Sequence, residues 1–275
     1  MENPTKKRVL VFGCSKAGKT SMLNTITGEK FKVSDAAVGT TFETQPFPNF
    51  EYNGKIYQFV DTAGLDESSG GNVPSQEALS NLYEVANDKE GFNLYIMVML
   101  KGGISQAIKK NYELFINHMK AKKIPVLCVV TRCESDDPLN KWVNNNRRDL
   151  EKKYEMEFDD MIGSCFAQER DGPLAEIYEK LRAKSKEDVM KIIDNMCAEE
   201  PYSISRKNLP DIFAKLLAVY FKFMNTLPSA EWVDENLIRL GFNEEERQSI
   251  KESLQNIATF AVIMGMKRMI IRQPL

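Results

Sequence analysis

The sequence predicts an α/β domain with a mostly parallel sheet, followed by a small all-helical C-terminal module. Short apolar runs rich in β-formers alternate with helical segments through the first two-thirds of the chain, which is typical of a parallel sheet covered on both faces. The first apolar run leads through a glycine-rich turn into a helix. Beyond about Ser185 only helical patterns remain. We therefore expect one domain over residues 1–184 and a helical extension over residues 185–275.

The totals indicate an ordinary soluble protein. The 275 residues are 43 % hydrophobic and 28 % charged, and the net charge of −2 gives no electrostatic case for a nucleic acid or an anionic membrane. Five scattered cysteines without a CxxC pair favour reduced thiols in the cytoplasm over disulfides or a zinc site. The polar start, MENPTKKRVL, argues against a signal peptide, and the apolar runs fall short of the ~20 residues that span a bilayer.

The predicted strands are apolar runs that end in polar or glycine-containing loops. Gln45–Tyr52 and Lys55–Val60 flank Asn53-Gly54, a strong signal for a type I′ hairpin, which adds an antiparallel edge to the sheet. The other strands are expected at Arg8–Phe12, Phe92–Leu100, Ile124–Thr131 and, more weakly, near Met161–Phe166.

The predicted helices connect these strands and then form the extension. The first, Lys19–Thr27, should end at Gly28 in the left-handed C′ position. Asn243 and Glu246 form a capping pair that opens the last helix, which could run to about Arg268. The others are expected at about Ser75–Lys89, Ser105–Lys120, Pro138–Tyr154, Leu174–Lys180, Glu187–Ala198, Leu209–Asn225 and Ala230–Leu240.

The glycine-rich turn reads GCSKAGKT and fits G-x-x-x-x-G-K-[ST] between a strand and a helix, the context that a phosphate-binding loop requires. Backbone N–H groups of the loop and of the helix start would surround a β-phosphate. Lys19 would reach the β- and γ-phosphate oxygens, and the Thr20 hydroxyl would bind Mg²⁺. The nucleotide-binding residues predicted here are Gly13, Cys14, Ser15, Lys16, Ala17, Gly18, Lys19, Thr20 and Ser21.

Two further segments are candidates for sensing the γ-phosphate. DTAG follows the second hairpin strand, so Asp61 can hold a Mg²⁺-bound water and the Gly64 N–H can contact the γ-phosphate. In the irregular stretch AVGTTFET, a threonine could bind Mg²⁺ through its hydroxyl and the γ-phosphate through its N–H. Thr41 is the choice, with Thr40 as the alternative.

The segment TRCE at the end of the Ile124 strand is the candidate for base recognition. Its residues Thr131, Arg132 and Glu134 lie where guanine-specific proteins carry [NT]-K-x-D, whose carboxylate accepts the N1–H and N2 amino protons of guanine. Adenine offers no such pair of donors. Asp136 or Asp137 could be the base contact instead. In GSCFA, Ser164 and Cys165 are candidates for a backbone N–H to guanine O6, or only the end of a strand.

These motifs follow one another in the order of a GTPase domain. Within that class the chain resembles the septin-like branch that contains the AIG-type proteins, the GTPases of immunity-associated proteins and the chloroplast outer-envelope import GTPases. The resemblance covers about residues 8–180 and is carried by VFGCSKAGKTSMLNTITGE, VDTAGLDES, FNLYIMVMLKGGISQAIKKNYELF and VVTRCESDD. It implies bound GTP or GDP with Mg²⁺, a Glu at the base site, and GTP-dependent homodimers or homo-oligomers.

The residue after DTAG is Leu65, where Ras-like enzymes carry a Gln that orients the attacking water. A leucine cannot do this, so we expect slow hydrolysis by a GTP-dependent switch or assembly protein. Ser15, in the phosphate loop, could donate to the γ-phosphate or crowd the water. The alternatives are a non-hydrolysing nucleotide-bound scaffold and, ranked last, a ribosome- or RNA-associated GTPase.

The remaining features receive simpler interpretations. His118 is the single histidine, so no other position could supply the histidine of a Ser-His-Asp triad, and His118 itself is read as a surface or half-buried residue of a helix. Cys14 is read as a small loop residue rather than a redox switch. The apolar stripe of the last helix is expected to pack on the chain itself, with a protein partner or a weak membrane-surface contact as alternatives.

Overall fold

The computed structural model describes residues 6–31, 44–62, 76–121, 123–167, 172–224 and 229–263. Contacts divide the chain into two compact units. The first consists of Met1–Glu67, Glu90–Tyr112 and Lys120–Tyr202, and the second of Ser68–Lys89, Glu113–Met119 and Ser203–Leu275.

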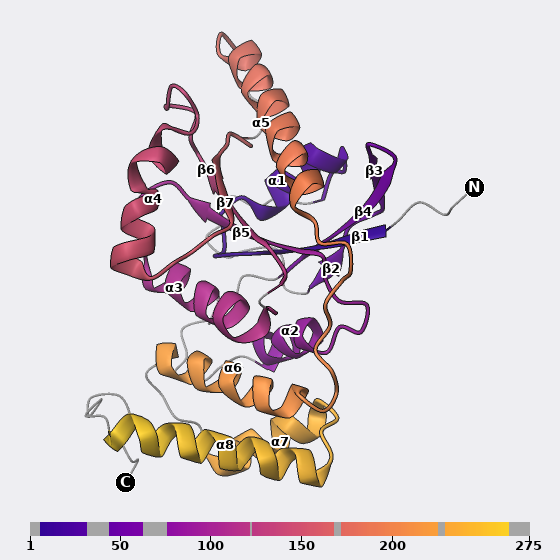
Figure 1. The fold of residues 1–275 in the computed structure, drawn as a ribbon, viewed down its shortest axis with the longest axis vertical. Helices are drawn as coiled ribbons and strands as arrows, with labels where there is room; N and C mark the ends of the chain where they lie inside the picture. Colours follow the sequence, from indigo (N-terminus) through magenta and orange to yellow (C-terminus); the bar gives the residue numbers. More distant parts are fainter. Residues whose placement is uncertain are drawn as a thin grey trace. The chain divides into compact units, whose positions relative to one another are not determined.

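The first unit is built on a seven-stranded sheet with the order β2-β4-β1-β5-β6-β7, in which β3 also pairs with β4. The strands are β1 Lys6–Phe12, β2 Gln45–Pro46, β3 Phe50–Tyr52, β4 Lys55–Asp61, β5 Leu94–Leu100, β6 Val126–Thr131 and β7 Asp160–Gly163. The pairs β1–β4, β1–β5, β5–β6 and β6–β7 are parallel, whereas β2 and β3 run antiparallel to β4 (Figure 1). The mostly parallel α/β prediction is therefore confirmed, including its antiparallel edge.

The helices of this unit are α1 Lys19–Thr27, α3 Gln106–Tyr112, α4 Lys141–Tyr154 and α5 Ala175–Met196. Helices α1 and α5 contact each other (Figure 1) and share one core with alternate residues of the strands. That core includes Val9, Val11, Met22, Leu23, Ile96, Val98, Leu127, Val129, Val189 and Ile193, which are all fully buried. The intervening residues of β1, β5 and β6 are buried too, so these strands are covered on both faces.

The local signals of turns and helix ends are confirmed. Asn53 and Gly54 both have positive φ, 49° and 71°, as a type I′ turn requires. Gly28 ends α1 with φ of 81° and donates its N–H to the carbonyl of Asn24 at 2.9 Å. The expected strand Gln45–Tyr52 is instead two short strands, because Pro46 and Pro48 have no N–H to give to a ladder.

The predicted division of one long segment into two helices was wrong. The segments expected at Leu174–Lys180 and Glu187–Ala198 form one helix, α5, that runs through residues 184 and 185. No Gly or Pro interrupts it, and Ser185 is buried there rather than breaking the helix. The helix expected at Ser105–Lys120 is confirmed in position, and its second half, η1 Glu113–Met119, is a π-helix that directly follows α3.

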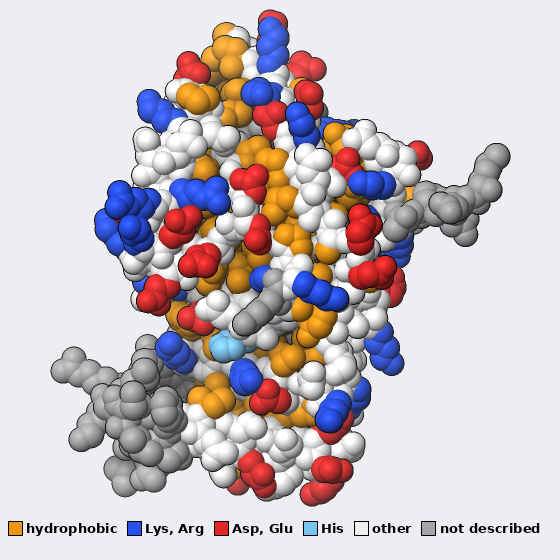
Figure 2. Space-filling view, in the orientation of Figure 1, with side chains coloured by type: hydrophobic (Ala, Val, Ile, Leu, Met, Phe, Trp, Pro, Cys, Tyr) orange, Lys and Arg blue, Asp and Glu red, His pale blue; other side chains and the backbone are white. Residues whose placement is uncertain are grey.

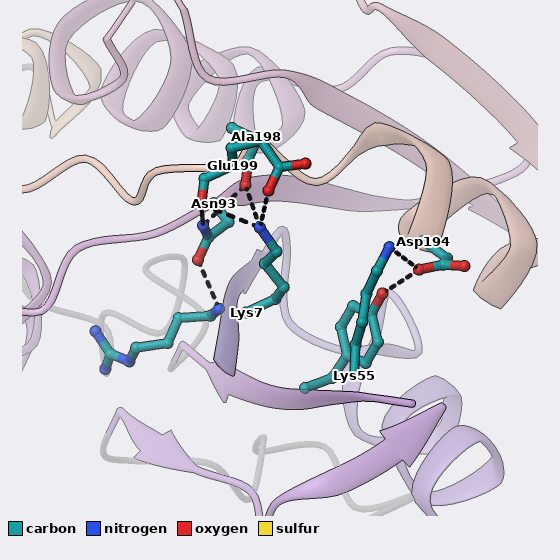
Figure 3. Close-up of polar contacts among 8 residues, drawn as sticks. Lys7, Lys55, Asn93, Asp194, Ala198 and Glu199 are labelled. Carbon is teal, nitrogen blue, oxygen red and sulfur yellow. Dashed lines mark hydrogen bonds and ion pairs between the residues drawn. The ribbon is translucent and has the colours of Figure 1, made fainter. Parts of the chain in front are cut away.

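After α5, residues 198–202 cross back over the start of the sheet. Phe92 and Tyr202 exchange both backbone hydrogen bonds at 2.9 Å, and Asn93 accepts the Ala198 N–H. The buried Lys7 ammonium donates to the carbonyls of Ala198 and Glu199 at 3.1 and 3.0 Å (Figure 3). The Asn93 side-chain amide also donates to the Ala198 carbonyl at 2.9 Å. The connection that follows α5 is thus held by the Lys7 side chain on β1 and by Asn93, which precedes β5.

The second unit is helical. It contains α2 Gln76–Ala86, η1, α6 Leu209–Met224, α7 Ala230–Arg239 and α8 Glu244–Ile263. The ring of Phe213 on α6 packs edge-on against Tyr83 on α2, with 5.7 Å between ring centroids, and its centroid lies 5.4 Å from that of Phe242 in the turn before α8. These aromatic contacts connect α6 to α2 and to that turn. The predicted capping pair is confirmed: Glu246 N–H donates to Asn243 Oδ1 at 2.9 Å, and Asn243 N–H donates to the Glu246 carboxylate at 3.0 Å.

Charged side chains of both signs are interspersed on the face drawn in Figure 2, in line with the small net charge. No helix in the described part of the chain is long and apolar enough to cross a membrane. The last helix is described as far as Ile263, so the stretch to Arg268 lies outside the described residues.

Candidate nucleotide-binding site

The phosphate loop connects β1 to α1 and has an unusual backbone that its glycines permit. Gly13 has φ of 143°, and a Cβ there would overlap the carbonyl oxygen of Val98 on β5. Gly18 has φ of 94° at the start of α1. Lys16 is also left-handed, with φ of 60°, and its side chain is exposed. The loop therefore turns tightly against β5, and only glycine, which has no Cβ, fits at position 13.

Lys19 lies under this loop. Its side chain is almost fully buried, and Nζ donates to the carbonyls of Gly13 at 3.0 Å and Cys14 at 3.1 Å. The two carbonyls hold the ammonium against the turn that surrounds the predicted phosphate position. Lys19 is thus fixed in place as a point charge before any phosphate arrives.

Thr20 and Asp61 meet although 41 residues separate them in the sequence. The Thr20 hydroxyl donates to Asp61 Oδ2 at 2.9 Å, because the parallel pairing of β1 with β4 places Asp61 beside Val11. Asp61 is fully buried, and its Oδ1 has no hydrogen-bond partner among the described residues. Burial raises the pKa of Asp61, while the Lys19 charge and the Thr20 hydrogen bond act in the opposite direction.

A buried carboxylate oxygen without a partner costs free energy unless a ligand satisfies it. Mg²⁺ prefers oxygen ligands and keeps several of its waters. The hydroxyl of Thr20 and the Oδ1 atom of Asp61 form such a donor set next to a buried lysine, so the residues present fit Mg²⁺ bound together with a phosphate.

Thr131 joins the base loop to the phosphate loop. Its hydroxyl donates to the Ala17 carbonyl at 2.8 Å, and its methyl group lies 3.4 Å from where a Cβ of Gly18 would be. The side chain of Thr131 therefore holds the two loops together. Its predicted contact with the nucleotide stays a prediction.

The loop after β6 carries the candidate base reader. Arg132 is exposed and left-handed, with φ of 62°, and Cys133 is buried with its N–H donated to the Ser164 carbonyl at 3.1 Å. One carboxylate oxygen of Glu134, Oε2, is buried without a partner in the described part of the chain. Asp136 Oδ2 is likewise buried without a partner there, while Asp136 Oδ1 accepts a hydrogen bond from Lys101 Nζ at 2.6 Å. Asp137 is exposed.

The loop after β7 holds the two candidates for guanine O6. The Ser164 N–H donates to the Val130 carbonyl at 2.8 Å, and its hydroxyl donates to the same oxygen at 3.0 Å. The Cys165 N–H donates to the hydroxyl of Ser185 on α5 at 2.9 Å. Both N–H groups have protein acceptors, so contact with O6 would require exchange of the acceptor.

The structure thus brings together the phosphate loop, Asp61, the TRCE segment and the Ser164–Cys165 segment at the carboxyl ends of the parallel strands, where α/β folds bind ligands. Ser15, Ser21 and Cys14 lie half-buried on the same loop and helix start. Thr40, Thr41, Gly64 and Leu65 lie outside the described residues.

Sequence reasoning missed two residues at this site, Lys101 and Ser185. Lys101 directly follows β5, beside the end of β6, so its position at a strand end was a usable signal. Ser185 lies between the two short helices that were expected, and only the continuous α5 brings it to Cys165.

Comparison with known proteins agrees with this geometry. Residues 8–132 match the model of a family described as 50S ribosome-binding GTPase. GTPase Der of Maridesulfovibrio salexigens is 43 % identical over 58 residues, which are 21 % of this chain and 13 % of that protein. GTPase Der of Desulforamulus reducens is 22 % identical over 163 residues, 59 % of this chain and 35 % of that protein. The chain thus spans about a third or less of the length of these two relatives.

A solved structure shows the same fold. A double variant of NFeoB from S. thermophilus, bound to GDP and AlF4−, superposes with a TM-score of 0.50 at 15 % identity, over 93 % of this chain and 92 % of that one. The phosphate loop, the parallel sheet and the matched family together show a GTP-binding P-loop GTPase domain with a helical C-terminal region.

The comparisons contradict the resemblance to the septin-like, AIG-type branch. The matching family model and the curated relatives are of the ribosome-binding and Der kind. The physical reason is that two of the quoted segments, the phosphate loop and DTAG, carry phosphate and Mg²⁺ chemistry that is common to P-loop GTPases in general. The other two are a buried strand with its following helix and the base loop, elements that any such domain contains. Such motifs identify the class of protein and cannot separate its branches.

Proposed function

We propose that this protein is a guanine-nucleotide switch that binds GTP and GDP with Mg²⁺ and hydrolyses GTP slowly. The single observation that carries the proposal is the Thr20–Asp61 pair beside Lys19: a hydroxyl, a buried carboxylate oxygen without a described partner and a buried ammonium at one loop. This donor set suits a nucleotide phosphate with its metal ion. The matched GTPase model and the fold support the same conclusion.

The residues of the chain act mainly by position and charge. Lys19 places a positive charge where the β- and γ-phosphate oxygens carry negative charge, and the N–H groups of the loop and of α1 donate to the phosphates. Thr20 and Asp61 would hold Mg²⁺, which when bound neutralises charge that develops on the phosphates. Thr41, Gly64 and Ser15 are proposed to contact the γ-phosphate. Leu65 offers no hydrogen bond to the attacking water, so the intrinsic rate should be low.

Glu134 is proposed as the group that selects guanine. Glu134 and Asp136 each have a buried oxygen without a described partner in the loop after β6. Asp136 is already bonded to Lys101 through its other oxygen, and Asp137 is exposed. A carboxylate here can accept both the N1–H and the N2 amino protons of guanine, and adenine presents no such pair. Among the three candidate carboxylates, the geometry favours Glu134.

Nucleotide competition tests the proposal. GDP, GTP, ADP and ATP compete against a fluorescent guanine nucleotide with and without Mg²⁺, and only the guanine nucleotides should displace it. Lys19→Ala should abolish binding. Glu134→Gln should lower the affinity for GDP by about 100-fold and raise the affinity for xanthosine diphosphate. Xanthine has an oxygen where guanine has the amino group, and the glutamine amide can donate a hydrogen bond to that oxygen. Equal displacement by ADP in the unaltered protein would overturn the proposal.

The description of the matched family favours a second candidate function, a switch that acts on the large ribosomal subunit. It runs against the expectation that the protein has no nucleic-acid partner. The test is cosedimentation with purified 50S subunits in the presence of GDP or a non-hydrolysable GTP analogue. Binding that depends on the GTP analogue would support this function, and no binding with either nucleotide would contradict it.

GTP-dependent pairing of two copies was expected from the resemblance that the comparisons contradict. The proposed switch therefore rests on the nucleotide site of one chain. Pairing stays a separate prediction, checked by the molecular mass in solution with GDP and with a GTP analogue. A cytoplasmic location is likewise proposed from the reduced-cysteine composition alone.

A further inference from the structure

An ion pair lies beside the candidate base reader and has no part in the function proposed above. Lys101, the residue after β5, donates from Nζ to Asp136 Oδ1 at 2.6 Å and to the Ser135 hydroxyl at 3.1 Å. The Lys101 and Asp136 side chains are only 24 % and 12 % exposed, so solvent screens this pair less than an ordinary surface pair. Loss of either partner would leave a charge that is mostly buried.

The backbone fixes the same turn from two sides. Lys101 N–H donates to the Thr131 carbonyl at 3.0 Å, and Cys133 N–H donates to the Ser164 carbonyl at 3.1 Å. Within the turn, Asp136 N–H donates to the Cys133 carbonyl at 2.9 Å. The segment that carries Glu134 is therefore anchored at the ends of β5 and β7, and Lys101 supplies its side-chain anchor.

Two carboxylates lie two residues apart in this turn, and each has a buried oxygen that lacks a partner among the described residues: Glu134 Oε2 and Asp136 Oδ2. Both carboxylates also act on the charge of Lys101, so the ammonium lies near the two of them. The hydrogen bond that Lys101 donates to Asp136, aided by the nearby negative charges, raises the pKa of Lys101 against the opposing effect of desolvation. Lys101 therefore stays charged and neutralises Asp136.

We propose that Lys101 is a positioning residue for guanine selectivity: it neutralises and holds Asp136, so that Glu134 is the one carboxylate presented to the base. This inference rests on the proposed function, in which Glu134 reads guanine. Without the ammonium, Asp136 would repel Glu134 and the turn would lose its side-chain anchor. The preference for guanine should fall, while the phosphate grip at Lys19 and Thr20 should remain.

The test is the ratio of GDP to ADP affinity in the full-length protein, measured by competition against a fluorescent guanine nucleotide. Lys101→Met should lower this ratio by about tenfold or more, because it leaves an uncompensated charge near the base. Lys101→Arg should largely keep the ratio. Lys153→Met is the matched control, because it removes the same side chain from an exposed ion pair with Asp149 on α4; it should leave the ratio unchanged.

A double substitution separates neutralisation from simple support of the loop. If Lys101 acts on the charge of Asp136, then Asp136→Asn in the Lys101→Met protein should restore most of the lost ratio. A Lys101→Met protein that keeps the ratio, or that loses GDP and ADP affinity equally, overturns the inference, and so does a double variant without recovery. If the Lys101→Met protein does not fold, Lys101→Gln replaces it, because glutamine retains an N–H donor without the charge. The ratio of GDP to ADP affinity must then fall in the same direction, but by less.

The unaltered protein in the same experiment separates the two proposals. If it binds ADP as well as GDP, the proposed function fails. If it prefers GDP and Lys101→Met prefers GDP equally, only the role of Lys101 fails.

Discussion

At the scale of single residues, Asp61 suits the proposed Mg²⁺ site but lowers the stability of the nucleotide-free protein. The folded protein keeps this carboxyl group fully buried with one oxygen lacking a partner in the described part of the chain, and burial raises its pKa. A carboxyl group whose folded pKa is raised destabilises the folded state at pH values above its unfolded pKa, and acidification relieves that cost. Above the unfolded pKa, the nucleotide-free protein therefore bears a cost for the buried Asp61 carboxyl group that grows as the pH rises.

Asp61→Asn should accordingly raise the melting temperature of the nucleotide-free protein at pH 7, on the order of 2–4 °C if about 1 kcal/mol is recovered. The same substitution should remove most of the Mg²⁺-dependent part of nucleotide affinity. Thermal unfolding with and without GDP and Mg²⁺ measures both effects. Asp149→Asn, in an exposed pair on α4, is the control and should change neither. A destabilised variant with normal Mg²⁺ dependence would contradict this account.

At this same scale, the residues that a sequence can reveal are those whose role is local. The phosphate-loop spacing places Lys19 and Thr20 on one turn, and the strand order brings Asp61 to them. Thr131 is predicted from the sequence to contact the nucleotide, and the structure adds that its hydroxyl donates to Ala17, 114 residues away in the sequence. Such a bond depends on which strands become neighbours, and the composition of TRCE carries no information about it.

At the scale of elements, the end of α5 is tied to the β3–β4 hairpin by one carboxylate. Asp194 accepts a hydrogen bond from Lys55 at 2.7 Å (Figure 3). It also accepts hydrogen bonds from Tyr57 at 2.6 Å, through the same oxygen, and from Asn53 at 3.0 Å, through the other oxygen. These donors, Lys55 first, lower the pKa of Asp194 from 3.8 to about 2. The strand β4 that ends at Asp61 is thereby anchored to a helix at its opposite end.

A lowered folded pKa stabilises the protein above the unfolded pKa, and this stability is lost as the pH falls through the folded value. Asp194→Asn should therefore cost about 1–2 kcal/mol at pH 7 and flatten the loss of stability between about pH 4 and pH 2. Urea unfolding at several pH values measures both. Lys55→Met, which keeps the carboxylate, should move the acid loss to higher pH. Parallel pH curves for the unaltered protein and the Asp194→Asn variant would show that this contact contributes nothing.

The sequence predicted elements well where short-range signals specify them. Gly28 and the Asn243–Glu246 pair mark helix ends by side chains and φ values within a few residues. The continuity of α5 was not predicted, because the polar stretch around Ser185 looks like a break between two helices. Ser185 can be buried because it accepts a hydrogen bond from the Cys165 N–H, which the local sequence does not show. The connection over residues 198–202 escaped for the same reason, since its partners are Lys7 and Asn93.

At the scale of the whole molecule, the compact units do not follow the order of the chain. The expected division at residues 184 and 185 separates an N-terminal domain from a helical extension, and it falls inside α5. The first unit continues to Tyr202, while the second includes Ser68–Lys89 and Glu113–Met119 from within the GTPase portion. A domain boundary read from the sequence keeps consecutive residues together. Compact units form instead where apolar surfaces pack, and these can come from distant parts of the chain. The division at 184 thus remains a prediction about independent folding.

Two variants on α5 test that division. Ile193 is fully buried in the core that contains Val11 and Leu23, whereas Ile177 on the same helix is 53 % exposed. Ile193→Ala should cost about 2–5 kcal/mol, and Ile177→Ala less than about 0.5 kcal/mol. If the GTPase unit extends through α5, the cost of Ile193→Ala appears in the unfolding transition that GDP and Mg²⁺ protect, because ligand binding stabilises only the unit that binds it. An independent domain ending at residue 184 would instead leave that protected transition unchanged in both variants.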